Sequence, residues 1–595
     1  MTTRQFQWAI TIFVGIVVII GGAALLIWHA FWPQVQRMPF FSNNRVVPFH
    51  EHHRLDPEIP NLIFGDARLP SDATQPFVDE DGVIYIPAAF LQSHFDQFLF
   101  WDAFAEVLFV TTRDDILTFY PGRTGFYING HSHQMEHPIR LVNDEVFLPA
   151  GLVEALYPLT ARHYTAYNLV VIENMAAPQT TAALTRRTDI RYNHSANATI
   201  AVQAPAGSIV TVFDEYGDFT RVRNQDGLLG WALTSSIGEP TTVIPLETLE
   251  RETLLGSFVN NTVHYPPNWP AGRPVVMAWD VTYVQAANAT RMEVPIHESL
   301  NVISPMWFRL DDETMTITSL ACREYVEWAQ EHGVQVWPYV FDVFYNHSRA
   351  ILTSREARQR VINRLLYYVD ELGLDGINIG FEHVEPTVGP YLIQFLRELA
   401  PPLRQRGVVL SKNVLVPRPY TRFYRRDLMA FTVDFIIVMA YDEHWHSAPT
   451  SGPVASLPFV IDGIEASLRE VPREQLVLGL PFYNRIWREV INDNTPVTRT
   501  RRYHGTGYTR EWFEYNFQQT DRQWEWLPEI GKYFGAFPAL EDGVMVEYLV
   551  WLECERSMDL KLQLFAGYEL AGVSIWNRNF RHNEGLWEVI GRYFP

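Results

Sequence analysis

The strongest constraint on the fold is a regular alternation of short apolar runs and amphipathic stretches between residues 270 and 595. This alternation is typical of βαβ units, whose strands form a parallel sheet. Eight strands over this length predict an α/β fold, a TIM (β/α)8 barrel. Because the stretch from about 488 to 550 is too long for one crossover, we expect an inserted α+β subdomain there. The eight runs are 274–280, 301–307, 334–340, 375–382, 408–414, 435–441, 476–482 and 571–577.

Two smaller modules are expected before the barrel. In residues 61–178, a strand that ends in Pro and opens a helix occurs twice, which predicts a small α+β module. This segment resembles the N-terminal-like domain of copper amine oxidases. It has no evident copper ligand set, so we expect no metal and no cofactor. Residues 180–240 alternate like short strands, and the turn at 215–218 with the closing Gly230-Trp231 resembles a bacterial SH3 domain. Such a small β-barrel either binds cell-wall peptides or acts as a spacer.

The N-terminus contains an apolar run long enough to cross a membrane. Residues 8–28 carry no charge, and the apolar character continues past His29 to Trp32. A bilayer core needs roughly 20 apolar residues. We therefore expect a transmembrane anchor over residues 1–33, with membrane contact through residues 8–32, and a linker over 34–60. The predicted location is the cell membrane, single-pass, with the large C-terminal part outside the cytoplasm.

Charge and cysteine content exclude several classes of protein. The chain has 47 Lys and Arg against 68 Asp and Glu, which gives a net charge of −21. Because affinity for phosphate backbones comes mainly from Lys and Arg, we expect no nucleic-acid partner. The two cysteines are too few for a disulfide framework or a zinc ribbon.

The strand 375–382 carries the candidate catalytic residue. Alternation along a strand sends Asn378, Gly380 and Glu382 into the barrel, and the residues between them toward the helices. Glu382 is the last inward residue, at the carboxyl end of the strand, where TIM-barrel active sites lie. A carboxyl there with apolar walls has a raised pKa, as a general acid needs. A strand-end Glu that simply faces solvent is the alternative.

The segment Asp375-Gly-Ile-Asn-Ile-Gly-Phe-Glu382 resembles the signature of glycoside hydrolase family 18, Asp-Gly-x-Asp-x-Asp-x-Glu. It is most similar to the branch of spore-cortex and cell-wall N-acetylglucosaminidases. Further matches follow in order: Met439-Ala-Tyr441-Asp442, the loops 452–457 and 478–483, and Trp576 at the place of the Trp under the reactive sugar. The resemblance covers roughly residues 275–595.

The resemblance implies a substrate-assisted retaining mechanism. The 2-acetamido carbonyl of the sugar attacks its own anomeric carbon, while Glu382 protonates the leaving oxygen and later acts as the base for water. Tyr441 would hold the acetamido oxygen and Trp576 would form the floor of the subsite. Other candidates follow from the motifs and from aromatic residues near strand ends. They are Asp442, Asn378 and Asp375 (the last in supporting hydrogen bonds), and Met439, Tyr483, Trp279 and Trp307 in substrate binding.

The chain departs from the family at one catalytic position. Gly380 stands where the family has its sixth-place Asp, which accepts the acetamido N–H and stabilises the oxazolinium. Losing one such group costs about 10²–10³ in rate, unless a water, Asp442 or Glu443 compensates. Three functions therefore stay open: a glycosidase acting on N-acetylglucosamine bonds in peptidoglycan or chitin-like glycans, a catalytically impaired barrel that binds wall glycan, and a structural spacer.

Overall fold

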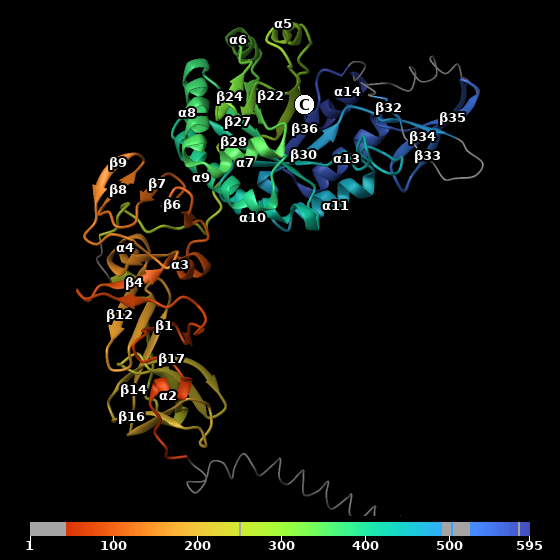
Figure 1. Cartoon of the computed structure of the whole chain (residues 1–595). Helices are drawn as coiled ribbons and strands as arrows, with labels where there is room; N and C mark the ends of the chain where they lie inside the picture. Colours follow the sequence, from red (N-terminus) through yellow and green to blue (C-terminus); the bar gives the residue numbers. More distant parts are fainter. Residues whose placement is uncertain (1–42, 249–251, 491–500, 504–523, 581–583, 595) are drawn as a thin grey trace, which may run out of the picture. The chain divides into compact units, whose positions relative to one another are not determined.

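Eight parallel strands form a closed barrel in the C-terminal part of the chain (Figure 1). The last strand, β36, pairs with both β30 and β21, which joins the end of the barrel to its beginning. The third strand consists of two short pieces, β25 and β26, separated by two residues, and β22 pairs with β25. Each strand overlaps one of the predicted runs. The strands are β21 (Val275–Asp280), β22 (Val302–Pro305), β25 (Gln335–Val336) with β26 (Tyr339–Phe341), β27 (Gly376–Gly380), β28 (Val409–Leu415), β29 (Phe435–Met439), β30 (Leu476–Pro481) and β36 (Gly572–Trp576).

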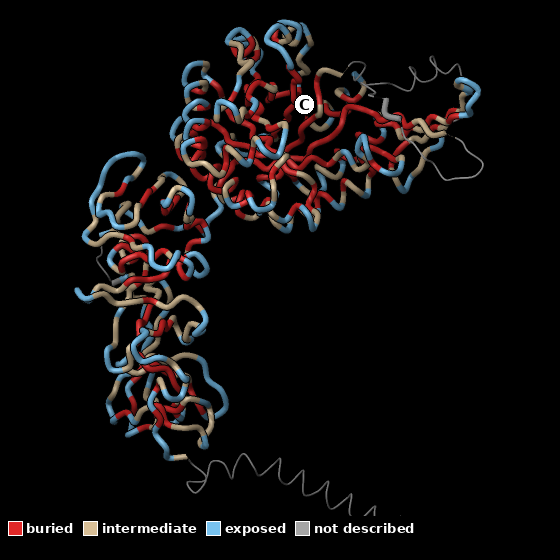
Figure 2. The backbone as a smooth tube through the Cα atoms, viewed as in Figure 1, coloured by how far each residue is buried: buried red, intermediate tan, exposed pale blue. Residues whose placement is uncertain are grey.

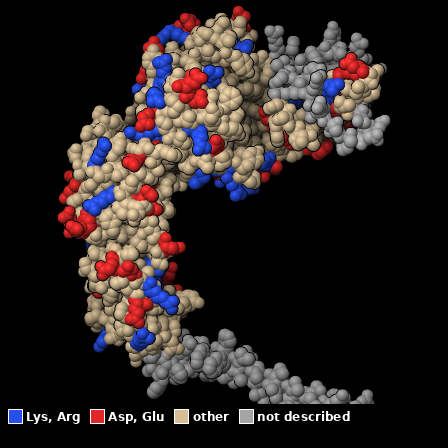
Figure 3. All heavy atoms as spheres, in the orientation of Figure 1, with Lys and Arg blue, Asp and Glu red and all other residues tan. Residues whose placement is uncertain are grey.

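The coordinates are a computed structural model that describes residues 43–248, 252–490, 501–503, 524–580 and 584–594. The chain divides into two units, and the barrel belongs to the second, which also contains residues 100–118 and 127–131. On the visible face of the barrel, acidic and basic side chains lie interspersed (Figure 3).

Helices cover the outside of the barrel, and buried residues run through its strands (Figure 2). The 18-residue helix α8 shows why these segments are helical. The side chain of Ser354 caps its first turn, and Gly373 ends it at φ 66°, a left-handed conformation that glycine adopts without strain. The helices are α5 (Ala287–Met292), α6 (Arg323–Glu331), α7 (Tyr345–Thr353), α8 (Arg355–Leu372), α9 (Gly389–Arg404), α10 (Arg426–Ala430), α11 (Leu457–Ser467), α13 (Glu555–Tyr568) and α14 (Glu584–Tyr593). A hairpin of β23 (Phe308–Asp311) and β24 (Thr316–Ser319) follows β22.

The predicted insertion is present between β30 and β36 as an antiparallel sheet. Its strands are β31 (Ile486–Val490), β32 (Arg501–Tyr503), β33 (Glu525–Leu527), β34 (Lys532–Glu541) and β35 (Val544–Leu552). All regular elements among its described residues are strands, whereas we expected α+β. The carboxylate of Glu553, which is buried just after β35, accepts hydrogen bonds from Lys561 on α13, at 2.6 and 2.5 Å, and from Lys532 on β34. This buried cluster joins the insertion to the barrel's helical layer.

Residues 43–248 form strands in several small sheets with three short α-helices, α2 (Phe49–His53), α3 (Ala88–His94) and α4 (Ala150–Leu156). Each of α3 and α4 follows a strand that ends in proline, as the repeated pattern predicted. Two of the sheets have four strands each. One contains β1 (Asn61–Phe64), β2 (Ala67–Arg68), β12 (Leu159–Tyr164) and β13 (Leu169–Asn174). The other contains β3 (Phe77–Val78), β4 (Ile84–Pro87), β10 (Arg140–Val142) and β11 (Glu145–Pro149).

The remaining strands of this part form a five-stranded and a seven-stranded sheet. The first contains β5 (Phe100–Asp102), β6 (Val107–Thr111), β7 (Ile116–Phe119), β8 (Gly125–Ile128) and β9 (His131–Gln134). The second contains β14 (Gln179–Ala183), β15 (Thr188–Arg191), β16 (Ile200–Ala204), β17 (Ile209–Tyr216), β18 (Phe219–Arg223), β19 (Leu229–Leu233) and β20 (Thr241–Val243). The SH3-like identity and the module boundaries remain predictions.

The β5–β6 hairpin belongs to the barrel's unit. Its residue Asp102 accepts a hydrogen bond of 2.8 Å from Arg358 on α8, whose Nε donates to Glu398 on α9 at 3.1 Å. Arg358 and Asp102 are fully buried and Glu398 is almost so. Nearby, Arg397 on α9 donates to the hydroxyl of Thr111 at 2.8 Å. Fully paired buried charges therefore fix this hairpin to the two helices.

The predicted transmembrane helix, and the single-pass membrane location that rests on it, must be corrected. Among the described residues, no helix is long and apolar enough to cross a bilayer. The helices α8 and α9, of 18 and 16 residues, both carry several charged side chains. The predicted segment itself, residues 8–32, lies outside the described residues. Neither the anchor nor the location is retained below.

Candidate active site

Glu382 lies directly after β27, at the carboxyl end of the barrel, and is partly buried. Its Oε1 accepts a hydrogen bond of 2.7 Å from the hydroxyl of Tyr339 on β26. Burial raises the pKa of the Glu382 carboxyl, although the Tyr339 hydrogen bond and the charge of Lys412 pull it down. The group therefore keeps its proton to higher pH than an ordinary Glu, as a general acid requires.

The backbone at Glu382 is held by side chains from the segments that follow the two neighbouring strands, β26 and β28. Both oxygens of Asp342, which follows β26, accept backbone N–H groups: Oδ1 from Glu382 at 2.9 Å and Oδ2 from His383 at 3.0 Å. Tyr424 donates to the carbonyl of Glu382 at 3.0 Å. Because both Asp342 oxygens are engaged in this way, its role is to orient the strand end that carries Glu382.

A buried lysine lies behind the candidate acid. The ammonium of Lys412 on β28 donates to the carbonyls of Phe381 at 3.1 Å and Asn413 at 2.5 Å. Burial lowers its pKa to about 8, while Glu382 and Asp342 oppose that shift. At neutral pH, Lys412 therefore supplies a positive charge near the site.

Gly380 leaves no hole beneath Glu382, because the ring of Tyr339 fills it. A Cβ added at Gly380 would overlap the Cε2, Cζ and hydroxyl positions of that ring. Tyr339 pairs with Asn378 across the two strands and is almost fully buried. Sequence reasoning missed Tyr339. The available signal was an inward-facing aromatic residue on the strand next to a glycine in a catalytic motif.

The interior of the barrel carries a polar layer below the candidate acid. The side-chain oxygen of Asn378 accepts hydrogen bonds from Trp279 at 3.2 Å and from Asn413 at 3.0 Å. Its side-chain nitrogen donates to Ser411 at 2.8 Å. Phe381, by contrast, contacts Phe395 on α9. The predicted alternation along this strand is therefore confirmed, and Asn378 lies inside the layer as an internal support.

Tyr441 and Asp442 follow β29 at the same end of the barrel. Burial and the Glu382 carboxyl raise the pKa of Tyr441 well above its ordinary value. Asp442 has a left-handed backbone at φ 58°. Its Oδ1 accepts a hydrogen bond of 2.5 Å from the Tyr483 hydroxyl, and another from Arg485. Asp442 is thus engaged by these two side chains and does not fill the place beneath Glu382.

The other suggested substitute for the missing Asp is also engaged elsewhere. The carboxylate of Glu443 accepts hydrogen bonds from the backbone of Ser456 at 2.7 Å and from its hydroxyl at 3.0 Å. Ser456 in turn caps helix α11. Glu443 therefore supports the start of that helix.

The predicted substrate-binding residues fall into two groups. Trp576, the last residue of β36, is partly exposed, and its ring lies 5.6 Å from that of Trp279. Met439, at the end of β29, and Tyr483 are both buried, though not fully. Trp279 lies wholly in the barrel core, and Trp307 donates its indole N–H to Asn288 on α5 at 2.8 Å. The burial of Trp279 and Trp307 argues against a direct contact with substrate.

Asp375 lies away from this constellation, at the amino end of β27. Its carboxylate accepts hydrogen bonds from Gln330 and from the backbone of Val336, both at 3.0 Å. These contacts join α6 and β25 to the start of β27. Asp375 is therefore a supporting residue of the opposite barrel end.

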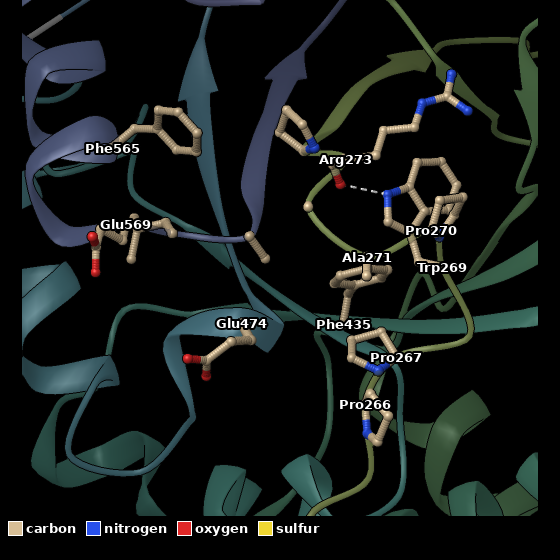
Figure 4. A pocket seen from close by; sticks show the side chains of 14 residues that line it. Pro266, Pro267, Trp269, Pro270, Ala271, Arg273, Phe435, Glu474, Phe565 and Glu569 are labelled. Atoms are coloured by element: carbon tan, nitrogen blue, oxygen red, sulfur yellow. Dashed lines mark hydrogen bonds between the residues drawn. The ribbon is translucent and has the colours of Figure 1, made fainter.

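A cavity of about 510 Å³ also lies at the amino ends of the strands (Figure 4). Its wall includes Phe435 at the start of β29 and Ala571 just before β36. Trp269 lines it as well and donates its indole N–H to the carbonyl of Arg273 at 2.7 Å. Since Glu382 lies at the carboxyl end of the barrel, this cavity is separate from the candidate active site.

This chain is similar in part to several known proteins. Residues 344–580 match the sequence model of the family described as Glycosyl hydrolases family 18, and residues 67–161 match Copper amine oxidase N-terminal domain. The putative sporulation-specific glycosylase YdhD of Bacillus subtilis is 26% identical over 41% of this chain and 56% of its own length. The Cortical fragment-lytic enzyme of Bacillus anthracis is 24% identical over 38% of this chain and 51% of its own length.

Among solved structures, the C-terminal domain of a putative chitinase from Desulfitobacterium hafniense is 18% identical, with a TM-score of 0.48 over 55% of this chain and all of that chain. The chain spans little more than half the length of the first curated relative. The segment that matches the family 18 model begins at residue 344, between β26 and α7. It includes Glu382, Tyr441 and Trp576. The family match and the barrel geometry together lead to one conclusion: this chain contains a glycosyl hydrolase family 18 domain.

Proposed function

We propose that this protein hydrolyses glycans that contain N-acetylglucosamine, with peptidoglycan as the favoured substrate and chitin-like chains as the related one. Glu382 acts first as the general acid and then as the general base. The observation that carries the proposal is a partly buried carboxyl of raised pKa at the carboxyl end of β27, oriented by Tyr339 and Asp342.

The reaction is proposed to be substrate-assisted and retaining. Retaining enzymes with a protein nucleophile place a second free carboxylate about 5–5.5 Å from the acid. Here the oxygens of Asp342 are bound to backbone N–H groups, and Asp442 is held by Tyr483 and Arg485. The acetamido oxygen of the sugar is therefore the nucleophile that this geometry favours. Tyr441, whose phenol stays neutral, is the proposed donor to that oxygen.

The substrate class is supported by the names of similar proteins. They include cortical fragment-lytic enzymes of Bacillus species and probable chitinases of Drosophila melanogaster. The partly exposed Trp576 at the end of β36 offers an aromatic face near the proposed site. Aromatic side chains combine a large apolar face with little conformational freedom, which suits a sugar ring.

The test is digestion of purified peptidoglycan and of chitooligosaccharides by the full chain, with Glu382→Gln beside it. Mass spectrometry should detect new N-acetylglucosamine reducing ends with the natural protein only. Proton NMR at early times should show the β-anomer of the product, because a retaining mechanism preserves configuration. Products of inverted configuration would exclude the substrate-assisted route.

A second candidate function is favoured by Gly380, the missing carboxylate of the family signature. A barrel that binds wall glycan without cleaving it would give no product with either protein. Both proteins would still sediment with insoluble peptidoglycan. That combination of results would replace the glycosidase proposal.

A further inference from the structure

The strand that carries Glu382 cannot accommodate a side chain at position 380 while Tyr339 keeps its place. The positions that a Cβ would overlap include the hydroxyl end of the Tyr339 ring, not a flexible tail. The ring is fixed by its neighbours, because it stacks on Phe341 at 5.7 Å and an interplanar angle of 11°. Gly380 and Tyr339 therefore form one unit, in which the loss of one side chain makes room for the other.

The Tyr339 hydroxyl lies where a neighbouring group can orient the Glu382 carboxyl and shift its pKa. It donates to Oε1 at 2.7 Å and lies 3.4 Å from the carbonyl oxygen of Gly380. A phenol can donate to a carboxylate and can also accept from a carboxylic acid. It can therefore stay hydrogen-bonded to Glu382 through both protonation states.

We propose that Tyr339 is the positioning residue for Glu382, and that it replaces the carboxylate that the family signature places at position 380. This inference rests on the proposed function, because it assigns Tyr339 a part in the acid–base cycle of that same site. A neutral phenol and an ionised Asp also shift the pKa of Glu382 in opposite directions. An anionic neighbour would raise the pKa of Glu382 by repulsion, whereas the Tyr339 hydrogen bond lowers it.

Other charged and titratable groups face Glu382 and set the rest of its environment. Lys412 and His383 favour the carboxylate, and Asp342 disfavours it. Tyr424 and Tyr441 remain neutral, because burial first and then the Glu382 charge raise the pKa of each phenol. A variant that removes only the Tyr339 hydroxyl leaves all of these groups in place.

The test compares Tyr339→Phe with Tyr424→Phe in the full chain. Both changes delete one hydroxyl bonded to Glu382, but Tyr424 touches only the backbone carbonyl. We expect Tyr339→Phe to lower kcat about 100-fold with KM nearly unchanged, the loss typical of one preorganised group. Because the lost hydrogen bond favoured the carboxylate, the alkaline limb of the pH profile should move to higher pH. Tyr424→Phe should leave that limb in place.

A second measurement does not depend on turnover. Carboxyl 13C shifts of Glu-labelled protein, with the Glu382 signal assigned from Glu382→Gln, report the titration of Glu382 directly. Tyr339→Phe should raise the Glu382 midpoint, and Tyr424→Phe should not. If the natural protein cleaves no glycan, the proposed function fails, and this titration still decides the Tyr339 assignment. An unchanged midpoint in Tyr339→Phe, or an unchanged kcat in an active enzyme, would overturn it.

Discussion

Replacing Arg358 by Met should strongly destabilise the barrel, because Arg358 is fully buried and binds three partners. It donates to Asp102 at 2.8 Å, to Glu398 at 3.1 Å and to the carbonyl of Leu352 at 2.7 Å. Methionine fills similar space but leaves two buried carboxylates without their cation. Breaking a buried ion pair in this way typically costs about 3–5 kcal/mol.

The pH dependence of this loss follows from the carboxyl of Glu398. Burial already raises the pKa of Glu398, and Arg358 is the largest influence that opposes the rise. Without the arginine, the pKa of Glu398 in the folded state rises further above its unfolded value of 4.5. The variant therefore loses stability as pH rises above 4.5. The loss relative to the natural protein grows by up to about 1.36 kcal/mol per pH unit over the range in which Glu398 is protonated in the folded variant but ionised in the folded natural protein.

The assay is urea unfolding followed by tryptophan fluorescence at pH 7 and pH 5. We expect a loss of about 3–5 kcal/mol at pH 7 and a smaller loss at pH 5. The matched control is Arg406→Met, since Arg406 binds Asp370 through two hydrogen bonds on the surface and should lose less than about 1 kcal/mol. A loss in Arg358→Met that matches the control, or one equally large at both pH values, would refute the reasoning.

Three further predictions concern the site and the insertion. Gly380→Asp should cleave less glycan than the natural protein, because the new side chain overlaps Tyr339. The double variant Gly380→Asp/Tyr339→Ala removes this overlap and should recover activity in the digestion assay. Trp576→Ala should raise KM for chitooligosaccharides about tenfold, equivalent to about 1.4 kcal/mol of binding, and an unchanged KM would exclude a contact with sugar. Lys561→Met should lower the urea midpoint at pH 7, because buried Glu553 loses one of its two cations. Although burial opposes the shift, the two lysines lower the pKa of Glu553 below its ordinary 4.5, so this difference should disappear as pH falls below that value.

The barrel was predictable because its strands are buried on both faces, which leaves continuous apolar runs between helices. Strand parity predicted that Glu382 faces into the barrel, and the contacts of Asn378 and Phe381 confirm that parity. The family signature carried the remaining motif residues. These features depend on local sequence, and the catalytic roles that the signature implies for the motif residues remain predictions.

Tyr339 was not predictable in the same way, because its role depends on the register between β26 and β27. That register pairs Tyr339 with Asn378 and so brings the Tyr339 ring over Gly380. The aromatic residues near strand ends could not be told apart from the sequence for a related reason. Whether Trp279 faces a substrate or the core depends on how deep it lies in the barrel, and the structure buries it completely.

The contact between Asp102 and Arg358 also has a consequence for the order in which the chain assembles. Asp102 leaves the ribosome 256 residues before Arg358, and Thr111 precedes Arg397 by 286 residues. At about 5–20 residues per second, the first interval is about 13 to 50 s. During that time the β5–β6 hairpin has no cation for its carboxylate. Its final packing must therefore wait until α8 and α9 have been synthesised, so this early segment completes its folding late.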